Sequence, residues 1–155
     1  MGVCQSSNLV GPAPKFGFEG LDTTAYVTRV IDGDTIDVNF MFRGVLNMFR
    51  IRMEGYDSPE MHPKKKGRAE ESLKAEVVEA NAAKKFLADL IEGKKVRLVS
   101  SGQGKFGRIL GTVHYRKQNV NQLMVNKGHG VPYNGGTKKQ FQPKKVTTGT
   151  TVKFE

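Results

Sequence analysis

The stretch that decides the fold is IDGDTIDVNFMFRGVLNMFRIRMEGYDSPE, residues 31–60. Within it, residues 34–42 and 47–55 each read as a strand bounded by turn residues. The turn between them lies around Arg43-Gly44, so the two runs predict an antiparallel hairpin.

Working outward from this hairpin, the chain predicts a small β-meander followed by helices and further strands. The expected elements are strands at 24–31, 34–42 and 47–55, a helix at 69–92, strands at 95–100 and 108–116, and a short helix at 120–127. The order β-β-β-α-β-β-α is typical of a five-stranded Greek-key barrel of the oligonucleotide-binding (OB) type, an α+β fold.

The longer helix has a repeating apolar pattern that predicts which face is buried. Val78, Ala82, Phe86 and Leu90 recur every four residues, and Ala83, Leu87 and Ile91 widen the stripe. Gly93 follows the last turn and is well placed to end the helix.

Length and composition set the outer bounds. The 155 residues fit one domain, expected over 23–135 between a Gly/Pro-rich tether at 1–22 and a basic tail at 136–155. A single Cys excludes an internal disulfide and a Cys-based zinc cluster. The net charge of +10 is typical of a polyanionic partner, either a nucleic acid or an acidic lipid surface, and equally of a merely soluble basic protein.

The hairpin also brings acidic residues together. Pairing with a turn near residues 44–45 places residue 34 close to residue 55, so Asp34 and Asp57 should meet at one end of the barrel with Arg52. Clustered carboxylates suit Ca²⁺ or Mg²⁺, and a guanidinium grips phosphate with two parallel hydrogen bonds. The alternative is a purely structural ion pair, because the same register sets Asp37 opposite Arg52.

Several motifs in this order resemble the staphylococcal-nuclease-like family over about residues 24–135. They are Ile31-Asp32-Gly33-Asp34-Thr35, Arg52-Met53-Glu54-Gly55-Tyr56-Asp57-Ser58-Pro59-Glu60, Phe106-Gly107-Arg108, and Val120-Asn121-Gln122-Leu123 followed by Gly128. The resemblance implies an OB-type barrel that hydrolyses DNA and RNA with Ca²⁺ and leaves 3′-phosphate ends.

The resemblance also implies roles for individual residues. It assigns Asp34, Asp57 and the carbonyl of Ser58 to Ca²⁺ binding. Glu60 matches the proposed general base, and Arg52 and Arg108 match the arginines that bind the scissile phosphate. The competing interpretation is a non-catalytic nucleic-acid-binding OB domain, and retention of these acidic and basic residues argues against it.

Three further residues are candidates for contact with nucleic acid. Lys64 and Lys65 belong to a basic loop that either contacts the backbone of the substrate or is simply solvated. Tyr133 lies near the position of a substrate-contacting tyrosine in the family.

The N-terminal residues Met1-Gly2-Val3-Cys4-Gln5-Ser6 match the pattern for N-myristoylation at Gly2, with Cys4 available for palmitoylation, although such a match also arises by chance. Two acyl chains, or one with a basic patch, give stable anchoring. The acylation pattern therefore predicts attachment to an acidic membrane surface at its cytoplasmic face. We also expect a monomer.

Overall fold

The computed structural model describes residues 16–136 and 141–142 of the chain. Its elements are β1 (Asp22–Asp32), β2 (Thr35–Phe42), β3 (Val45–Met53), β4 (Gly55–Asp57), α1 (Glu70–Ile91), β5 (Lys95–Gln103), the 3₁₀ turn η1 (Lys105–Gly107), β6 (Ile109–Tyr115), β7 (Gln118–Asn119), α2 (Val120–Asn126) and β8 (Val131–Tyr133). The predicted order of main strands and helices is confirmed, with three short strands added.

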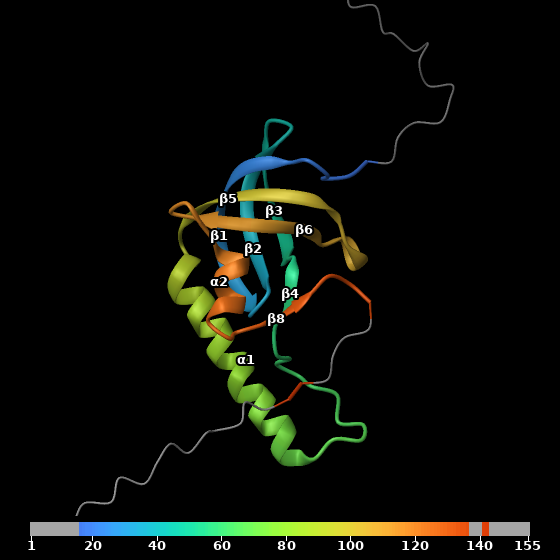
Figure 1. The fold of residues 1–155 in the computed structure, drawn as a ribbon. Coiled ribbons are helices and arrows are strands. Elements are labelled where there is room, and N and C mark those ends of the chain that lie inside the picture. The colour runs from blue at the N-terminus through green and yellow to red at the C-terminus, as the bar shows by residue number, and fades with distance from the viewer. Residues whose placement is uncertain (1–15, 137–140, 143–155) are drawn as a thin grey trace, which may run out of the picture.

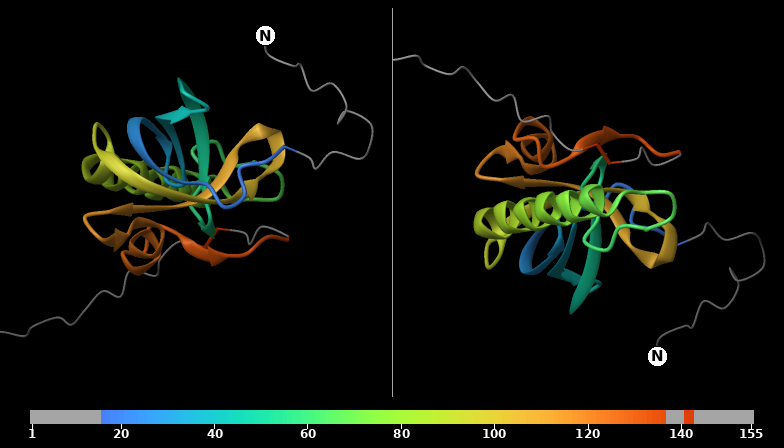
Figure 2. Two further views of the ribbon diagram at one scale, coloured as in Figure 1. Left: turned by 90° about the horizontal axis from the view of Figure 1, so that it is seen from above. Right: turned by 90° about the horizontal axis from the view of Figure 1, so that it is seen from below.

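Five strands form a closed barrel. They are hydrogen-bonded in the order β3-β2-β1-β5-β6, and a parallel pairing of β3 with β6 closes the sheet. The short β4 and β8 pair with each other at one end, beside the long helix α1 (Figure 1). Figure 2 shows α1 and α2 on different sides of the barrel. The predicted OB-like α+β fold is confirmed.

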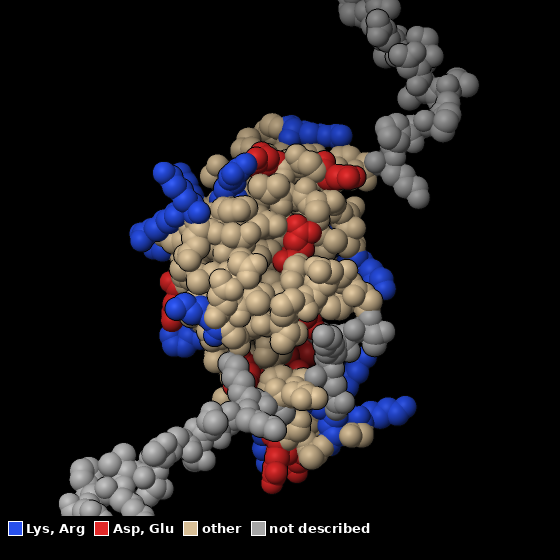
Figure 3. Space-filling model, in the orientation of Figure 1, with Lys and Arg blue, Asp and Glu red and all other residues tan. Residues whose placement is uncertain are grey.

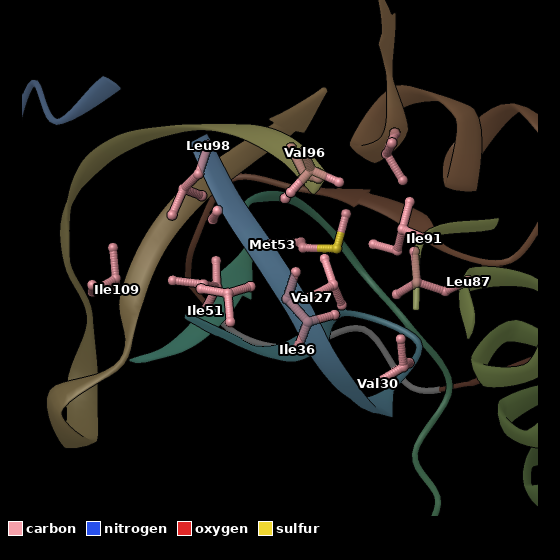
Figure 4. Packing of buried hydrophobic residues seen from close by; sticks show 14 of the residues in the cluster. Val27, Val30, Ile36, Ile51, Met53, Leu87, Ile91, Val96, Leu98 and Ile109 are labelled. Atoms are coloured by element: carbon pink, nitrogen blue, oxygen red, sulfur yellow. The ribbon is translucent and has the colours of Figure 1, made fainter. Parts of the chain in front are cut away.

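The barrel interior holds the hydrophobic core. Figure 4 shows side chains from every barrel strand converging there, and they meet Leu87 and Ile91 of α1. Val27, Ile36 and Ile51 are fully buried. Alternation along β3 leaves Arg50 and Arg52 on the opposite face from the buried Ile51 and Met53, as predicted.

The buried face of α1 differs from the predicted stripe. Ala80, Ala83, Leu87 and Ile91 are buried, whereas Val78 is 68% exposed. The apolar residues of this helix cover enough of its surface to form two overlapping stripes. The stripe that contains Ala80 and Ala83 is the one buried where α1 contacts β1.

The register of the β2–β3 hairpin also differs from the prediction, by two residues. Arg43 and Gly44 both have positive φ, 52° and 78°, so they form the tight two-residue turn that pairs Phe42 with Val45. Arg52 therefore lies opposite Thr35, and Asp37 lies opposite Arg50. The expected Asp37–Arg52 pair is wrong, since Asp37 binds Arg50 at 2.8 Å instead.

Part of the predicted tether packs on the barrel. Phe18 is buried, and its ring lies 5.3 Å from that of Phe42 and 5.4 Å from that of Phe49. The amide of Gly20 donates to Ser100 of β5 at 3.0 Å. Residues 16–21 thus belong to the folded unit, whereas residues 1–15 and most of the tail at 136–155 lie outside the described residues.

Phe18→Ala should lower the free energy of unfolding by about 3–5 kcal/mol, the usual cost of removing a buried phenylalanine. Phe16→Ala is the matched control, because Phe16 is largely exposed and should change stability little. Urea denaturation followed by circular dichroism measures both. Equal small effects would mean that residues 16–21 are dispensable for the fold.

Candidate active site

A single guanidinium joins two carboxylates at the end of the hairpin. Arg52 Nη1 lies 2.8 Å from Asp34 Oδ2, and Arg52 Nη2 lies 2.7 Å from Asp57 Oδ1. Only 15% of the Arg52 side chain is exposed, and 9% of each aspartate side chain. Two negative charges this close repel each other in a partly dry environment, and the shared arginine offsets that repulsion. The predicted meeting of Asp34, Arg52 and Asp57 is confirmed.

Main-chain contacts fix this cluster in place. The amide of Ser58 donates to Asp34 Oδ2 at 3.0 Å, so the exit from β4 is bonded directly to the start of β2. The Thr35 hydroxyl donates to the other oxygen of Asp34, also at 3.0 Å. Tyr56 donates its buried hydroxyl to the carbonyl of Gly33 at 2.7 Å.

Gly33 is required for the close approach of three segments. A Cβ at this position would come within 2.8 Å of the Ser58 Cβ and 2.9 Å of the Ala83 Cβ. Contacts this short do not occur between real side chains, so any larger residue would push Ser58 or α1 away. The glycine thereby sets the distance between Asp34 and Ser58.

Beside the cluster lies a pocket of about 810 Å³. Asp57, Ser58 and Glu60 line it, and Lys64 and Val131 line it as well. The side chain of Glu60 is exposed. Figure 3 shows acidic atoms set back in a hollow at the lower end of the molecule. The predicted base, two of the three predicted metal ligands and one predicted backbone-binding lysine therefore share one cavity.

The other predicted residues lie on neighbouring elements. Arg108 immediately precedes β6, two residues before Leu110, the register partner of Arg52 in the parallel pairing of β3 and β6. Lys65 is exposed on the loop before α1, and its carbonyl accepts from the Arg68 amide at 3.1 Å. Tyr133 pairs with Gly55, and its hydroxyl donates to the carbonyl of Gly136 at 2.8 Å. Gly2 and Cys4 lie outside the described residues.

A buried carboxylate that the sequence did not reveal holds the loop that carries Glu60. Glu76 of α1 is 4% exposed, and its Oε1 accepts the backbone amide of Glu60 at 3.0 Å. Its Oε2 binds Arg68 Nη1 at 2.5 Å, and Arg68 Nη2 donates to Ser72. The spacing of Glu76 from Ala80 and Ala83 was a usable signal, because it places Glu76 on the buried face of the helix.

Glu76→Gln should lower the free energy of unfolding by about 3 kcal/mol, since it leaves the Arg68 charge buried without its partner. It should also lower kcat through a displaced Glu60 loop. Thermal unfolding measures the first effect, and an assay of the nuclease activity that the family resemblance implies measures the second, with the exposed Glu71→Gln as control. The double variant Arg68→Met, Glu76→Met should recover the free energy of unfolding, while its kcat should stay low. Recovery of both the free energy of unfolding and kcat would assign Glu76 a purely structural role.

Asp32 is a second acidic residue that the sequence did not place in the site. Its pKa is raised to about 6, first by burial and then by the neighbouring charge of Asp34. One oxygen of Asp32 accepts the amide of Asp34 at 3.2 Å. The site therefore concentrates more negative charge than Arg52 alone neutralises.

This raised pKa predicts a pH-dependent stability in the metal-free protein. Between about pH 4 and 6 the folded state binds the Asp32 proton more tightly than the unfolded state does, so stability should fall as pH rises through this window. Asp32→Asn removes the effect and should be more stable than the parent above pH 6, with the gain vanishing near pH 4. Urea denaturation in chelator across this range tests it; a gain independent of pH would contradict it.

The donor set fits a hard cation. Among residues 16–136 and 141–142, no three His, Cys, Asp or Glu side chains gather as a metal-binding group. Arg52 brings the carboxylates of Asp34 and Asp57 together, and the main-chain group that contacts Asp34 there is the Ser58 amide. Carboxylate and carbonyl oxygens are the ligands of Ca²⁺ and Mg²⁺, so these residues fit the predicted metal.

Comparison with known proteins places this geometry in a family. A family model described as staphylococcal nuclease homologue matches residues 50–148. The chain belongs to the staphylococcal nuclease family. The match includes Arg52, Asp57, Glu60 and Arg108, while Asp34 precedes it.

Curated relatives of this staphylococcal nuclease homologue have been named as endonucleases. A Haemophilus influenzae protein named uncharacterized endonuclease is 32% identical over 110 residues, 71% of this chain and 52% of the relative. An Escherichia coli protein with the same name is 34% identical over 108 residues, 69% of this chain and 59% of the relative. The chain thus spans between half and two thirds of the length of these relatives.

Proposed function

We propose that this staphylococcal nuclease homologue is a Ca²⁺-dependent nuclease that hydrolyses phosphodiester bonds in DNA and RNA and leaves 3′-phosphate ends. The observation that carries the proposal is Arg52 held between Asp34 and Asp57, beside the pocket that Glu60 lines. Family membership and the endonuclease names of the relatives support it.

The proposed reaction is attack of water on the phosphorus. Glu60 accepts a proton from the water while the water oxygen bonds to phosphorus, and the bond from phosphorus to the 5′ oxygen breaks. The departing 5′ oxygen takes up a proton, and the phosphate stays on the 3′ oxygen. Negative charge grows on the phosphate oxygens during attack, and the guanidinium groups of Arg52 and Arg108 would stabilise it.

The carboxylates of Asp34 and Asp57 would hold the calcium ion, which supplies positive charge to the scissile phosphate when bound. Arg52 already contacts one oxygen of each carboxylate. The same two carboxylates would therefore orient both the cation and Arg52, and the Ser58–Asp34 hydrogen bond would keep that arrangement rigid.

Cleavage of a 5′-labelled single-stranded DNA with Ca²⁺, and separately with chelator, tests the proposal. Products should form only with Ca²⁺, and phosphatase should retard their electrophoretic migration because it removes a 3′-phosphate. Binding without cleavage under every condition would favour the non-catalytic OB domain. Cleavage that ignores the chelator would reject the calcium mechanism.

We further propose that acylation at Gly2 and Cys4 tethers the protein to the cytoplasmic face of a membrane as a monomer. None of the helices in the described part of the chain combines the length and apolar content needed to cross a bilayer. The support is the sequence pattern at residues 1–6. Gly2→Ala expressed in a eukaryotic cell should move the protein to the soluble fraction, and unchanged membrane recovery would reject the tether.

A further inference from the structure

The β2–β3 hairpin exposes a group of large apolar side chains near its tip. Met41, Val45, Leu46 and Met48 are 59%, 59%, 62% and 65% exposed. Met41 and Leu46 are direct cross-strand partners with Met48 two residues further on the same face, while Val45 pairs with Phe42 on the other face, so the tip is apolar on both faces. Isolated exposed apolar residues are common, whereas several together on one element usually mark a contact surface. We call these four residues the hairpin patch.

The N-terminal end of the described chain lies against the same tip. The Phe16 ring is 5.8 Å from that of Phe42, and the Arg43 guanidinium lies 5.0 Å from the Phe16 ring and 5.5 Å from the Phe42 ring. Figure 1 shows this segment running beside the hairpin tip, at the opposite end of the strands from β4 and β8. The tip thus presents a cation among apolar groups.

We propose that the hairpin patch, together with Phe16 and Arg43, docks on an anionic lipid surface. Apolar side chains at such a surface enter the boundary of the acyl region, and arginine meets the negative headgroups. This inference rests on the proposed tether. Where Gly2 alone is acylated, binding is marginal, so a second apolar and cationic contact would convert transient attachment into stable attachment.

The position of the tether favours lipid over other occupants of the patch. Gly2 is 14 residues before Phe16, so even a fully extended chain would allow a separation of only roughly 50 Å between them. The tether would join the domain at Phe16, which lies beside the tip, so the hairpin patch is next to the point of attachment. The tether gives no corresponding reason for a second copy of the chain to occupy the hairpin patch.

Docking by this patch would orient the candidate active site. From Phe42 at the tip to Thr35 beside Arg52, β2 advances seven residues, roughly 23 Å. The Asp34–Arg52–Asp57 end would then face away from the lipid. Nucleic acid is repelled by anionic headgroups, so this orientation keeps the pocket open to a polyanionic substrate.

The test uses full-length protein, myristoylated by co-expression with an N-myristoyltransferase, and vesicles of phosphatidylcholine with or without phosphatidylserine. The hairpin variant Leu46→Ser, Met48→Ser should weaken binding to the phosphatidylserine vesicles at least about tenfold. The control Val78→Ser removes an equally exposed apolar residue from α1 and should leave binding unchanged. Cleavage of single-stranded DNA in solution should be the same in all three proteins.

A second measurement reports orientation. In a Cys4→Ser background, a fluorophore at Leu46→Cys should be quenched by nitroxide-labelled lipids, and one at the exposed Asn81→Cys of α1 should not. Vesicle binding that is equal in the parent and the hairpin variant would overturn the docking while leaving the tether intact. No vesicle binding by the myristoylated parent would reject both. A dimer in sedimentation velocity that the hairpin variant abolishes would assign the patch to a second copy instead.

Discussion

Replacing Arg52 with lysine should lower kcat for DNA cleavage by about 100- to 1,000-fold, the usual effect of removing one preorganised donor from a developing negative charge. The guanidinium contacts Asp34 and Asp57 at once through two different nitrogens. A lysine ammonium is a single point charge, so it cannot bridge both carboxylates and also grip a phosphate in a bidentate manner. Steady-state kinetics on single-stranded DNA measure the loss.

Arg50→Lys is the matched control, because Arg50 lies two residues earlier on the same face of β3. It binds Asp37, away from the pocket, and half of its side chain is exposed. Its replacement should leave kcat within a fewfold of the parent. Equal losses in the two variants would mean that Arg52 acts through general surface charge, which would contradict the proposed site.

Stability should change in Arg52→Lys as well, and Ca²⁺ should modify that change. With one bridge lost, the charges of Asp34 and Asp57 are less well compensated, so the free energy of unfolding in chelator should fall. A bound cation should then stabilise the variant more than it stabilises the parent. Thermal unfolding with and without Ca²⁺ shows this, and equal Ca²⁺ shifts in both proteins would place the metal elsewhere.

Replacing Glu60 with glutamine should lower kcat by about 10²- to 10⁴-fold, the range for loss of a positioned general base. The isosteric amide cannot accept the proton of the attacking water. The main chain should remain in place, because it is the amide of Glu60, and not its side chain, that donates to Glu76. Substrate affinity should therefore change much less than kcat.

The exposed Glu70→Gln at the start of α1 is the control, and it should retain full activity. The pH dependence of kcat separates a base from a structural residue. The parent should lose activity toward acid pH, while the residual activity of Glu60→Gln should lack that limb. A variant with parental kcat would show that another group removes the proton.

The hairpin shows how far the sequence could predict the site. Alternation in residues 47–55 identified the outward face of Arg52, and antiparallel pairing brought Asp34 and Asp57 together. The pairing was nevertheless displaced by two residues, because an arginine with positive φ in a two-residue turn is uncommon. A register shift of two residues keeps every side chain on the same face of the sheet. The predicted meeting of Asp34, Arg52 and Asp57 was therefore correct, whereas the predicted partner of Asp37 was wrong.

Other features depend on contacts between different elements, which a local pattern reveals only in part. Glu76 lies on the buried face of α1 because the Glu60 amide and Arg68 meet it there. Phe18 was assigned to a tether by its Gly/Pro-rich neighbours, yet it fills a gap beside Phe42 and Phe49. In both cases the partner that decides the position comes from a different element of the fold.

The parallel closure of β3 on β6 has a consequence during synthesis. Asp34, Arg52, Asp57 and Glu60 all leave the ribosome before Arg108, which the pairing of β3 with β6 sets two residues before Leu110, the partner of Arg52. A nascent chain that lacks β6 therefore cannot present both arginines to one phosphate. Under the proposed function, which uses both arginines, full activity is therefore reached only after β6 has joined the barrel.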